Sequence, residues 1–160
     1  MLKIVQHTPA WVWGVLLLLL VLGFWQSRTR AVPRGALLLL PVMMPVFAVY
    51  GLVASFGWSA VALGGWLAGL LLPLGVLRFL PAMPGVHRRE DGRIHVPGSR
   101  WPGVWMLAIF VIRYVLGAAA ARHWPGMENV ALVLPVAFAL GMLGGLFVLR
   151  SVRILRAVSA

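Results

Sequence analysis

The sequence predicts an all-α integral membrane bundle of five transmembrane helices, and three observations carry this prediction. Hydrophobic residues make up 62% of the 160 residues and charged residues only 11%, which is too little polar surface for a soluble domain. The hydrophobic residues form five apolar stretches, near residues 10–25, 36–56, 58–79, 103–121 and 129–149. A helix of about 20 apolar residues crosses a hydrocarbon core of about 30 Å. Residues 1–160 are therefore expected to form a single transmembrane domain.

Arginine is distributed unevenly among the segments between the stretches. One set of alternate segments holds Lys3 and Arg122, whereas the other set holds Arg28, Arg30, Arg34, Arg78, Arg88, Arg89, Arg93, Arg100, Arg150, Arg153 and Arg156. Positive residues are retained in the cytoplasm. The N-terminus is therefore predicted to lie outside and the C-terminus in the cytoplasm. Tryptophans then mark the two membrane interfaces, the outer one by Trp11, Trp13, Trp58 and Trp124 and the inner one by Trp25, Trp101 and Trp105.

The first stretch is interpreted as a retained anchor. The sequence Trp25-Gln26-Ser27-Arg28 at its end is a poor match to the small-residue cleavage site of a signal peptide. Prolines interrupt three of the other stretches, at Pro41 and Pro45, at Pro73 and at Pro135. Each proline removes one backbone donor and leaves a carbonyl about one turn upstream free to accept another hydrogen bond.

Glycines recur at close-packing spacing in the third and fifth stretches. The motifs are Gly65-x3-Gly69 and Gly141-x3-Gly145, with Gly64 and Gly144 beside them. Small residues four apart line one helix face and let two helices approach closely. These motifs predict tight packing of the helices that carry them.

The third gap is the one connecting segment with structure of its own. Residues 86–96 are predicted to form a small cytoplasmic β-hairpin, because Asp91-Gly92 suits a type I′ turn and residues 93–96 alternate polar with apolar. Pro97-Gly98 then ends the second strand. The hairpin is interpreted first as a solvated connector, and alternatively as a lid or a partner contact.

Arg113 is the charged residue near the centre of a span. A central arginine costs about 2.5–3.5 kcal/mol on insertion scales, so its side chain is expected to face a polar group or a ligand. The acceptors available are carbonyls freed by proline, the Tyr50 or Tyr114 hydroxyl, water, lipid phosphate, or an anionic or carbonyl-bearing small molecule. The candidate ligand-binding residues are Arg113, Tyr114, Tyr50, Pro41 and Pro135. Purely structural bonding of Arg113 between helices is the alternative.

A weak internal repeat is a further hypothesis. A shift of 94 residues aligns Trp11–Leu52 with Trp105–Leu146 and superimposes Pro41 on Pro135. Inverted repeats of this kind are typical of transporters, whose sites lie near the membrane midplane at the repeat interface.

Several classes of function are excluded or disfavoured by composition. The chain has no cysteine, which excludes disulfides, thiolate catalysis and Cys-ligated metals. The four histidines show no short-spaced pair, so no metal and no cofactor is expected. The net charge is +11, and the basic residues that produce it lie mostly beside the spans. This pattern is typical of topology signals rather than of nucleic-acid binding. No metalloprotease or serine-hydrolase motif is present, so an enzyme is not expected.

The opening His7-Thr8-Pro9-x-Trp11-Val12-Trp13 and the later Asp91-Gly92-Arg93 and Pro97-Gly98-Ser99 resemble an uncharacterised bacterial integral-membrane family. A looser similarity is to CcdC-like membrane proteins, carried by Arg78, Asp91-Gly92 and Arg113. These resemblances imply a small, multi-pass protein of the bacterial inner (cell) membrane, and they carry no catalytic residues over.

Two functions stay open at this point. The first is binding or transport of a small molecule or lipid around Arg113. The second is an accessory subunit or assembly factor of a larger membrane complex. Membrane lipid is the expected partner in both, and a homo-oligomer is compatible with either.

Overall fold

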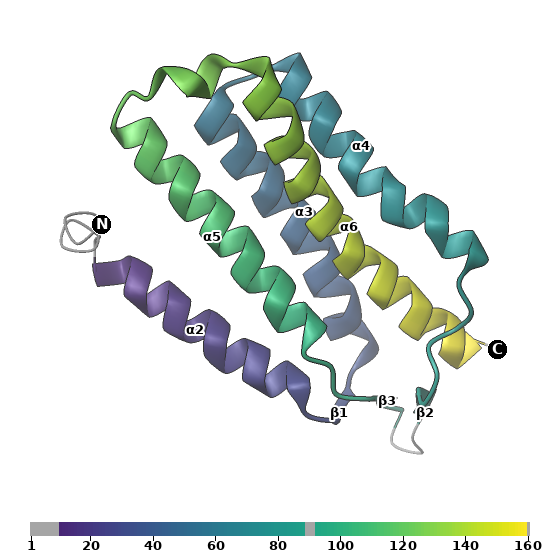
Figure 1. The fold of residues 1–160 in the computed structure, drawn as a ribbon. Helices are drawn as coiled ribbons and strands as arrows, with labels where there is room; N and C mark the ends of the chain where they lie inside the picture. The colour runs from purple at the N-terminus through teal and green to yellow at the C-terminus, as the bar shows by residue number, and fades with distance from the viewer. Residues whose placement is uncertain (1–9, 89–91, 160) are drawn as a thin grey trace.

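A computed structural model describes residues 10–88 and 92–159 and shows a bundle of helices with a small sheet at one end (Figure 1). The helices are α2 (Ala10–Ser27), α3 (Arg34–Phe56), α4 (Ala60–Val76), α5 (Trp101–Ala121) and α6 (Val130–Ser159). The strands are β1 (Arg30–Val32), β2 (His87–Arg88) and β3 (Ile94–Val96). Short 3₁₀ helices, η1 (Leu77–Phe79) and η2 (Pro125–Glu128), follow α4 and precede α6.

The five predicted helices are present in the described part of the chain. Four segments are long and apolar enough to cross a bilayer, namely Gly35–Phe56, Ala60–Phe79, Trp101–Ala121 and Val130–Val158. The apolar part of α2, Val12–Ser27, is shorter. The helical fold is therefore confirmed, whereas a fifth crossing by α2 and the orientation in the membrane stay predictions.

The last helix differs from its predicted bounds. The apolar stretch ends at residue 149, but α6 continues to Ser159, so that Arg150, Arg153 and Arg156 lie on a helix instead of in a tail. Ile154 lies between these arginines and is 2% exposed. Because one face of this last part packs on the sheet, the helix persists beyond the point at which its mean hydropathy falls.

The α4–α6 interface forms through the predicted glycine motifs. A Cβ atom built on Gly69 would overlap the Phe138 carbonyl oxygen, and one on Gly141 would overlap the Trp66 carbonyl oxygen. A Cβ on Gly145 would lie 2.6 Å from the backbone of α4. The two helices are thus in backbone contact, and the predicted tight packing is confirmed.

The two neighbouring glycines do not share this role. A Cβ on Gly64 would have no other atom within 4 Å, and one on Gly144 would reach Leu70 at 3.9 Å, an ordinary contact. The expectation that Gly64 and Gly144 assist the close approach is therefore wrong. They lie one residue away from the contacting stripe and so point about 100° aside from it.

Helix α2 lies along α5 at the edge of the bundle (Figure 1). The contact is close at Gly103, where a Cβ would lie 2.9 Å from the Gly23 Cα. Because the two helices are antiparallel and meet at this point, α2 covers the half of α5 that is nearer the sheet.

The sheet joins two segments that are far apart in the sequence. Its strand order is β1-β3-β2, with both pairs antiparallel. The predicted hairpin is confirmed as the β2–β3 pair, with His87 opposite His95 and their rings stacked at 4.4 Å. Gly92 has a φ of 77°. Arg88 pairs with Ile94, which leaves five residues between the paired positions, so the predicted two-residue type I′ turn at Asp91-Gly92 is not shown, and Asp91 lies outside the described residues.

Strand β1 was not predicted, because three residues between two helices are too few to show an alternating pattern. Its addition gives the hairpin a buried face, which two strands alone lack. Val32 of β1 and Ile94 and Val96 of β3 pack there with Leu37 of α3 and Ile154 of α6. The sheet is therefore anchored to the bundle and is not a free connector.

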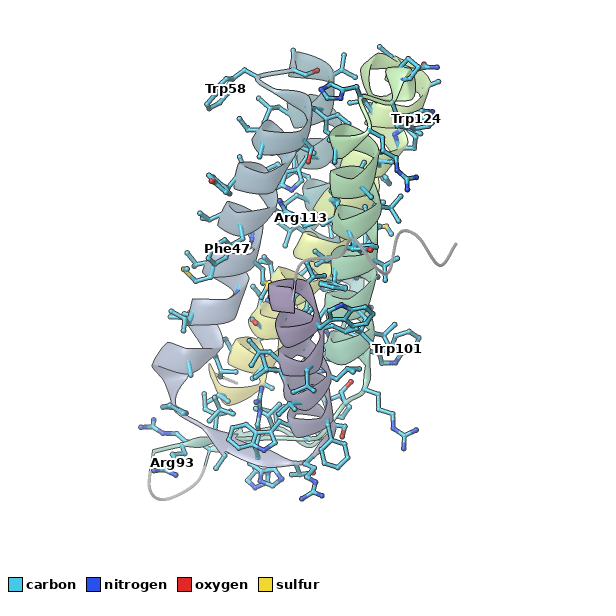
Figure 2. All side chains as sticks on the ribbon, turned by 90° about the vertical axis from the view of Figure 1, so that its left-hand side faces the viewer. Phe47, Trp58, Arg93, Trp101, Arg113 and Trp124 are labelled. Carbon is cyan, nitrogen blue, oxygen red and sulfur yellow. The ribbon has the colours of Figure 1, made fainter. Side chains whose placement is uncertain are left out.

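Tryptophans lie at both ends of the bundle. Figure 2 shows Trp58 and Trp124 at one end, and Trp101 near the other end, where the sheet and Arg93 lie. Tryptophans at both ends suit a bundle that crosses a bilayer, in either orientation.

Candidate functional site

Arg113 lies near the middle of α5, and Figure 2 shows it between α3 and α5. Its Nη1 donates a hydrogen bond to the Phe47 carbonyl oxygen at 2.8 Å. The guanidinium lies against Gly51, where a Cβ atom would overlap it. Arg113 therefore lies flat against the backbone of α3.

The acceptor is not one of the carbonyls that the sequence suggested. Pro41 and Pro45 free the carbonyls four residues upstream of themselves. Phe47 lies beyond both prolines, and the fourth residue after it is Gly51. The expectation that a carbonyl freed by proline accepts from Arg113 is therefore wrong. A carbonyl oxygen has two lone pairs, so the Phe47 oxygen can accept this bond while it also accepts one from within the helix.

The other predicted site residues do not converge on Arg113. Tyr114 follows it on α5, so its side chain points about 100° away around the helix, where its ring stacks on Phe110 at 6.3 Å. Tyr50 is 75% exposed on the outer side of α3. Pro41 is buried on α3, whereas Pro135 is exposed on α6, so the two prolines have different surroundings.

Two contributors to the site, Gly51 and Phe47, were missed. Phe47 acts through its backbone, which leaves no signal in the side-chain pattern. Gly51 had a usable signal, because it is the one glycine inside α3 after the first turn, and an arginine near a span centre needs a small residue opposite. Ser55 adds a further polar group nearby, since its Oγ donates to the Gly51 carbonyl oxygen at 2.9 Å.

The charge of Arg113 has no countercharge in the five α-helices. The acidic residues of the chain are Glu90, Asp91 and Glu128, and none lies within α2 to α6. A guanidinium carries several N–H donors arranged as a fork. Within the described residues, the bond to Phe47 is the hydrogen bond that Arg113 makes, so further N–H groups are available.

An apolar groove lies on the part of α5 beyond the reach of α2. It has a volume of about 440 Å³ and is lined by Tyr114, Val115, Ala118, Ala119, Arg122, Trp124 and Pro125. The lining is mostly apolar, with the Arg122 charge at the end of α5. Such a surface suits an apolar chain better than a polar solute.

Comparisons with known proteins come from two sources. A family model described as a family of unknown function (DUF6622) matches residues 1–160. The uncharacterized protein PM0739 of Pasteurella multocida (strain Pm70) is 38% identical over 71 residues, which cover 44% of this chain and 55% of the relative. The match therefore spans about half the length of that relative. No solved structure matches the chain.

These comparisons support one of the two resemblances that the sequence suggested, and not the other. The expectation of a family without an assigned activity is confirmed, while the similarity to CcdC-like proteins is not shown. Residues 7–9 of the opening motif lie outside the described residues. Because the family model covers the whole length, the chain belongs to this family of unknown function, DUF6622.

Proposed function

We propose that this protein is a multi-pass inner-membrane protein that binds the anionic or carbonyl group of a small molecule or lipid at Arg113. The observation that carries the proposal is a guanidinium between α3 and α5, with one described hydrogen bond and no acidic residue in any of the five α-helices. An ion transferred into a low-dielectric medium without a partner is costly. A ligand that brings a negative or strongly polar oxygen to Arg113 removes that cost.

The environment of Arg113 supports binding over a purely structural bond. A structural bond between the helices uses one N–H group, and the hydrogen bond to Phe47 accounts for it. The other N–H groups of the guanidinium are not needed for that role. The fork geometry of the remaining N–H groups suits two oxygens of one carboxylate or phosphate. Because Gly51 has no side chain, the Arg113 guanidinium rests directly on the backbone of α3. This backbone contact fixes the position of the guanidinium.

The experiment that tests this role separates binding from structural bonding. Arg113→Leu is expected to leave the protein folded in detergent, with a thermal midpoint no lower than that of wild-type protein stripped of lipid by long detergent washing. The reason is that leucine removes an uncompensated charge along with one hydrogen bond of about 1 kcal/mol net. A midpoint for Arg113→Leu well below that of the stripped wild type would show that the arginine serves to hold the helices together.

The orientation of the protein is part of the proposal. The sheet end carries most of the arginines, and we propose that it faces the cytoplasm. Alkaline phosphatase fused after Ala160 is expected to be inactive, because it stays in the cytoplasm, whereas a fusion in the α5–α6 loop after Trp124 is expected to be active. The reverse pattern would contradict the N-outside, C-cytoplasmic topology.

A further inference from the structure

A second polar site lies at the sheet end, away from Arg113. A cleft of about 40 Å³ opens where α2 ends, β1 begins and α6 passes the sheet. Its polar lining residues are Gln26, Arg28, Arg30, Arg150 and Ser151. A volume of this size holds a group of a few heavy atoms, such as one phosphate, but not a whole nucleotide.

The strand register directs Arg30 into this cleft. Arg30 pairs with Val96, and residues directly opposite each other in a sheet project from the same face. Val96 is 5% exposed and faces the helices, so Arg30 lies on the inner face as well. Burial lowers the pKa of Arg30 from its ordinary value, because the charged form loses hydration there.

Arg150 reaches the same cleft from α6. Its Nη2 lies 3.5 Å from the Pro97 carbonyl oxygen, which is a long and weak hydrogen bond. Arg30 is close enough to repel it electrostatically. Arg28 completes the cluster, with its guanidinium stacked 4.8 Å from the centre of the Phe24 ring. The fold thus holds the charges of Arg30 and Arg150 close together, although each would be better hydrated apart.

The other two arginines of α6 have a structural role, because each donates a hydrogen bond to a backbone carbonyl of the segment after α4. Arg153 donates from Nε to the Pro81 carbonyl oxygen at 3.0 Å, and Arg156 donates from Nη1 to the Leu77 carbonyl oxygen at 3.3 Å. Both hold the segment after α4 against α6. The arginines in the cleft form no comparable set of bonds, and none of its described lining residues is acidic.

The loop that bounds the cleft is tightly packed. Ser99 donates its backbone N–H to the Gln26 carbonyl oxygen at 3.0 Å, and a Cβ on Gly98 would overlap the Ser27 carbonyl oxygen. The buried Gln26 amide is in turn held by the Met106 sulfur at 3.4 Å. The walls of the cleft are therefore ordered before any ligand arrives, which lowers the entropic cost of binding.

We propose that this cleft binds one phosphate group, held by Arg28, Arg30 and Arg150 at the sheet end of the bundle. Guanidinium groups pair with phosphate through two parallel N–H···O bonds, and several of them offset its charge. Phosphate is also the anion that a membrane surface supplies, and basic pockets beside spans bind lipid head groups. The phosphate comes either from phosphatidylglycerol in the bilayer or from a soluble molecule, and the two sources are distinguished by experiment.

The lipid arm uses native mass spectrometry of the purified full-length chain titrated with phosphatidylglycerol, with phosphatidylcholine as the zwitterionic reference. The soluble arm follows the thermal midpoint as inorganic phosphate is added in detergent. Wild type is expected to retain one phosphatidylglycerol per chain, or to show a thermal midpoint that rises by several degrees when inorganic phosphate is added. Arg30→Gln is expected to weaken the binding of the effective probe at least tenfold. Arg28→Gln, which changes an exposed residue, is expected to do the same. Arg88→Gln, which removes the same charge from the exposed strand β2, is expected to leave it unchanged.

The proposal is overturned if neither probe binds wild type, or if Arg88→Gln weakens binding as much as Arg28→Gln and Arg30→Gln. Binding that is lost in Arg113→Leu and kept in Arg30→Gln belongs to the midspan site, so it contradicts a phosphate site here.

Discussion

Gly141→Ala is expected to separate α4 from α6 and to cause a large loss of stability for so small a substitution. The added methyl group would overlap the Trp66 carbonyl oxygen and lie close to the Leu70 backbone nitrogen. Backbone atoms cannot rotate away as a side chain does, so one helix must shift along its whole length. Overpacking typically costs about 1–3 kcal/mol, and a backbone-to-backbone clash is expected at or above the top of that range.

A matched control exists within the same helix pair. Gly64→Ala adds the same methyl group where no other atom lies within 4 Å, and alanine favours the helix, so its stability is expected to be equal or slightly higher. The measurement is the free energy of unfolding of both variants in mixed micelles. Equal stability of Gly141→Ala and Gly64→Ala would contradict the close α4–α6 packing.

Gly51→Ala is expected to have a large effect of a different kind, on binding rather than on folding. A Cβ on Gly51 would occupy the space of the Arg113 guanidinium. This clash is with the end of a flexible side chain, so the arginine swings away and loses its bond to Phe47 while the helices stay in place. The protein is expected to fold with a midpoint within a few degrees of wild type and to lose any molecule held at Arg113.

Gly35→Ala is the control for this variant, because it lies on the same helix and its Cβ would meet no atom within 4 Å. The amount of small molecule or lipid retained per chain, measured for both variants, checks the prediction. Retention by Gly51→Ala equal to that of Gly35→Ala would show that the position of Arg113 against α3 does not matter for binding.

Much of the fold could be predicted because five long apolar stretches leave few alternatives to helices. In the lipid environment that the sequence predicts, backbone groups must bond within their own segment, so each stretch is expected to be a helix. The glycine motifs then predicted tight packing of the helices that carry them, and the structure pairs those two helices, α4 and α6, with each other at Gly69 and Gly141. The elements that were missed lie where hydropathy carries no information. Strand β1 is three residues long, and the end of α6 is held by tertiary contact of Ile154 with the sheet.

The candidate site was predictable only in part. Arg113 was found because a charge in an apolar span is conspicuous. Its acceptor is a backbone oxygen of Phe47, and every residue has one, so the sequence could not single it out. Tyr50 and Tyr114 were chosen for chemistry without knowledge of helix rotation, and the rotation turns both away from Arg113. The cleft with Arg30 was beyond prediction, because it depends on a strand register across distant segments.

The central claim is that Arg113 holds a ligand, and the most direct test is native mass spectrometry of the protein gently extracted from its own membrane. Wild type is expected to carry one small molecule or lipid per chain that is absent from Arg113→Leu prepared in the same way. The mass of that molecule would identify the ligand class. A bare wild-type chain, the same set of bound molecules on both proteins, or a co-purifying protein subunit with nothing at Arg113 would contradict the claim, whereas phosphatidylglycerol that Arg113→Leu keeps and Arg30→Gln loses belongs to the cleft at the sheet end. The co-purifying subunit would favour a role as an accessory subunit of a larger membrane complex.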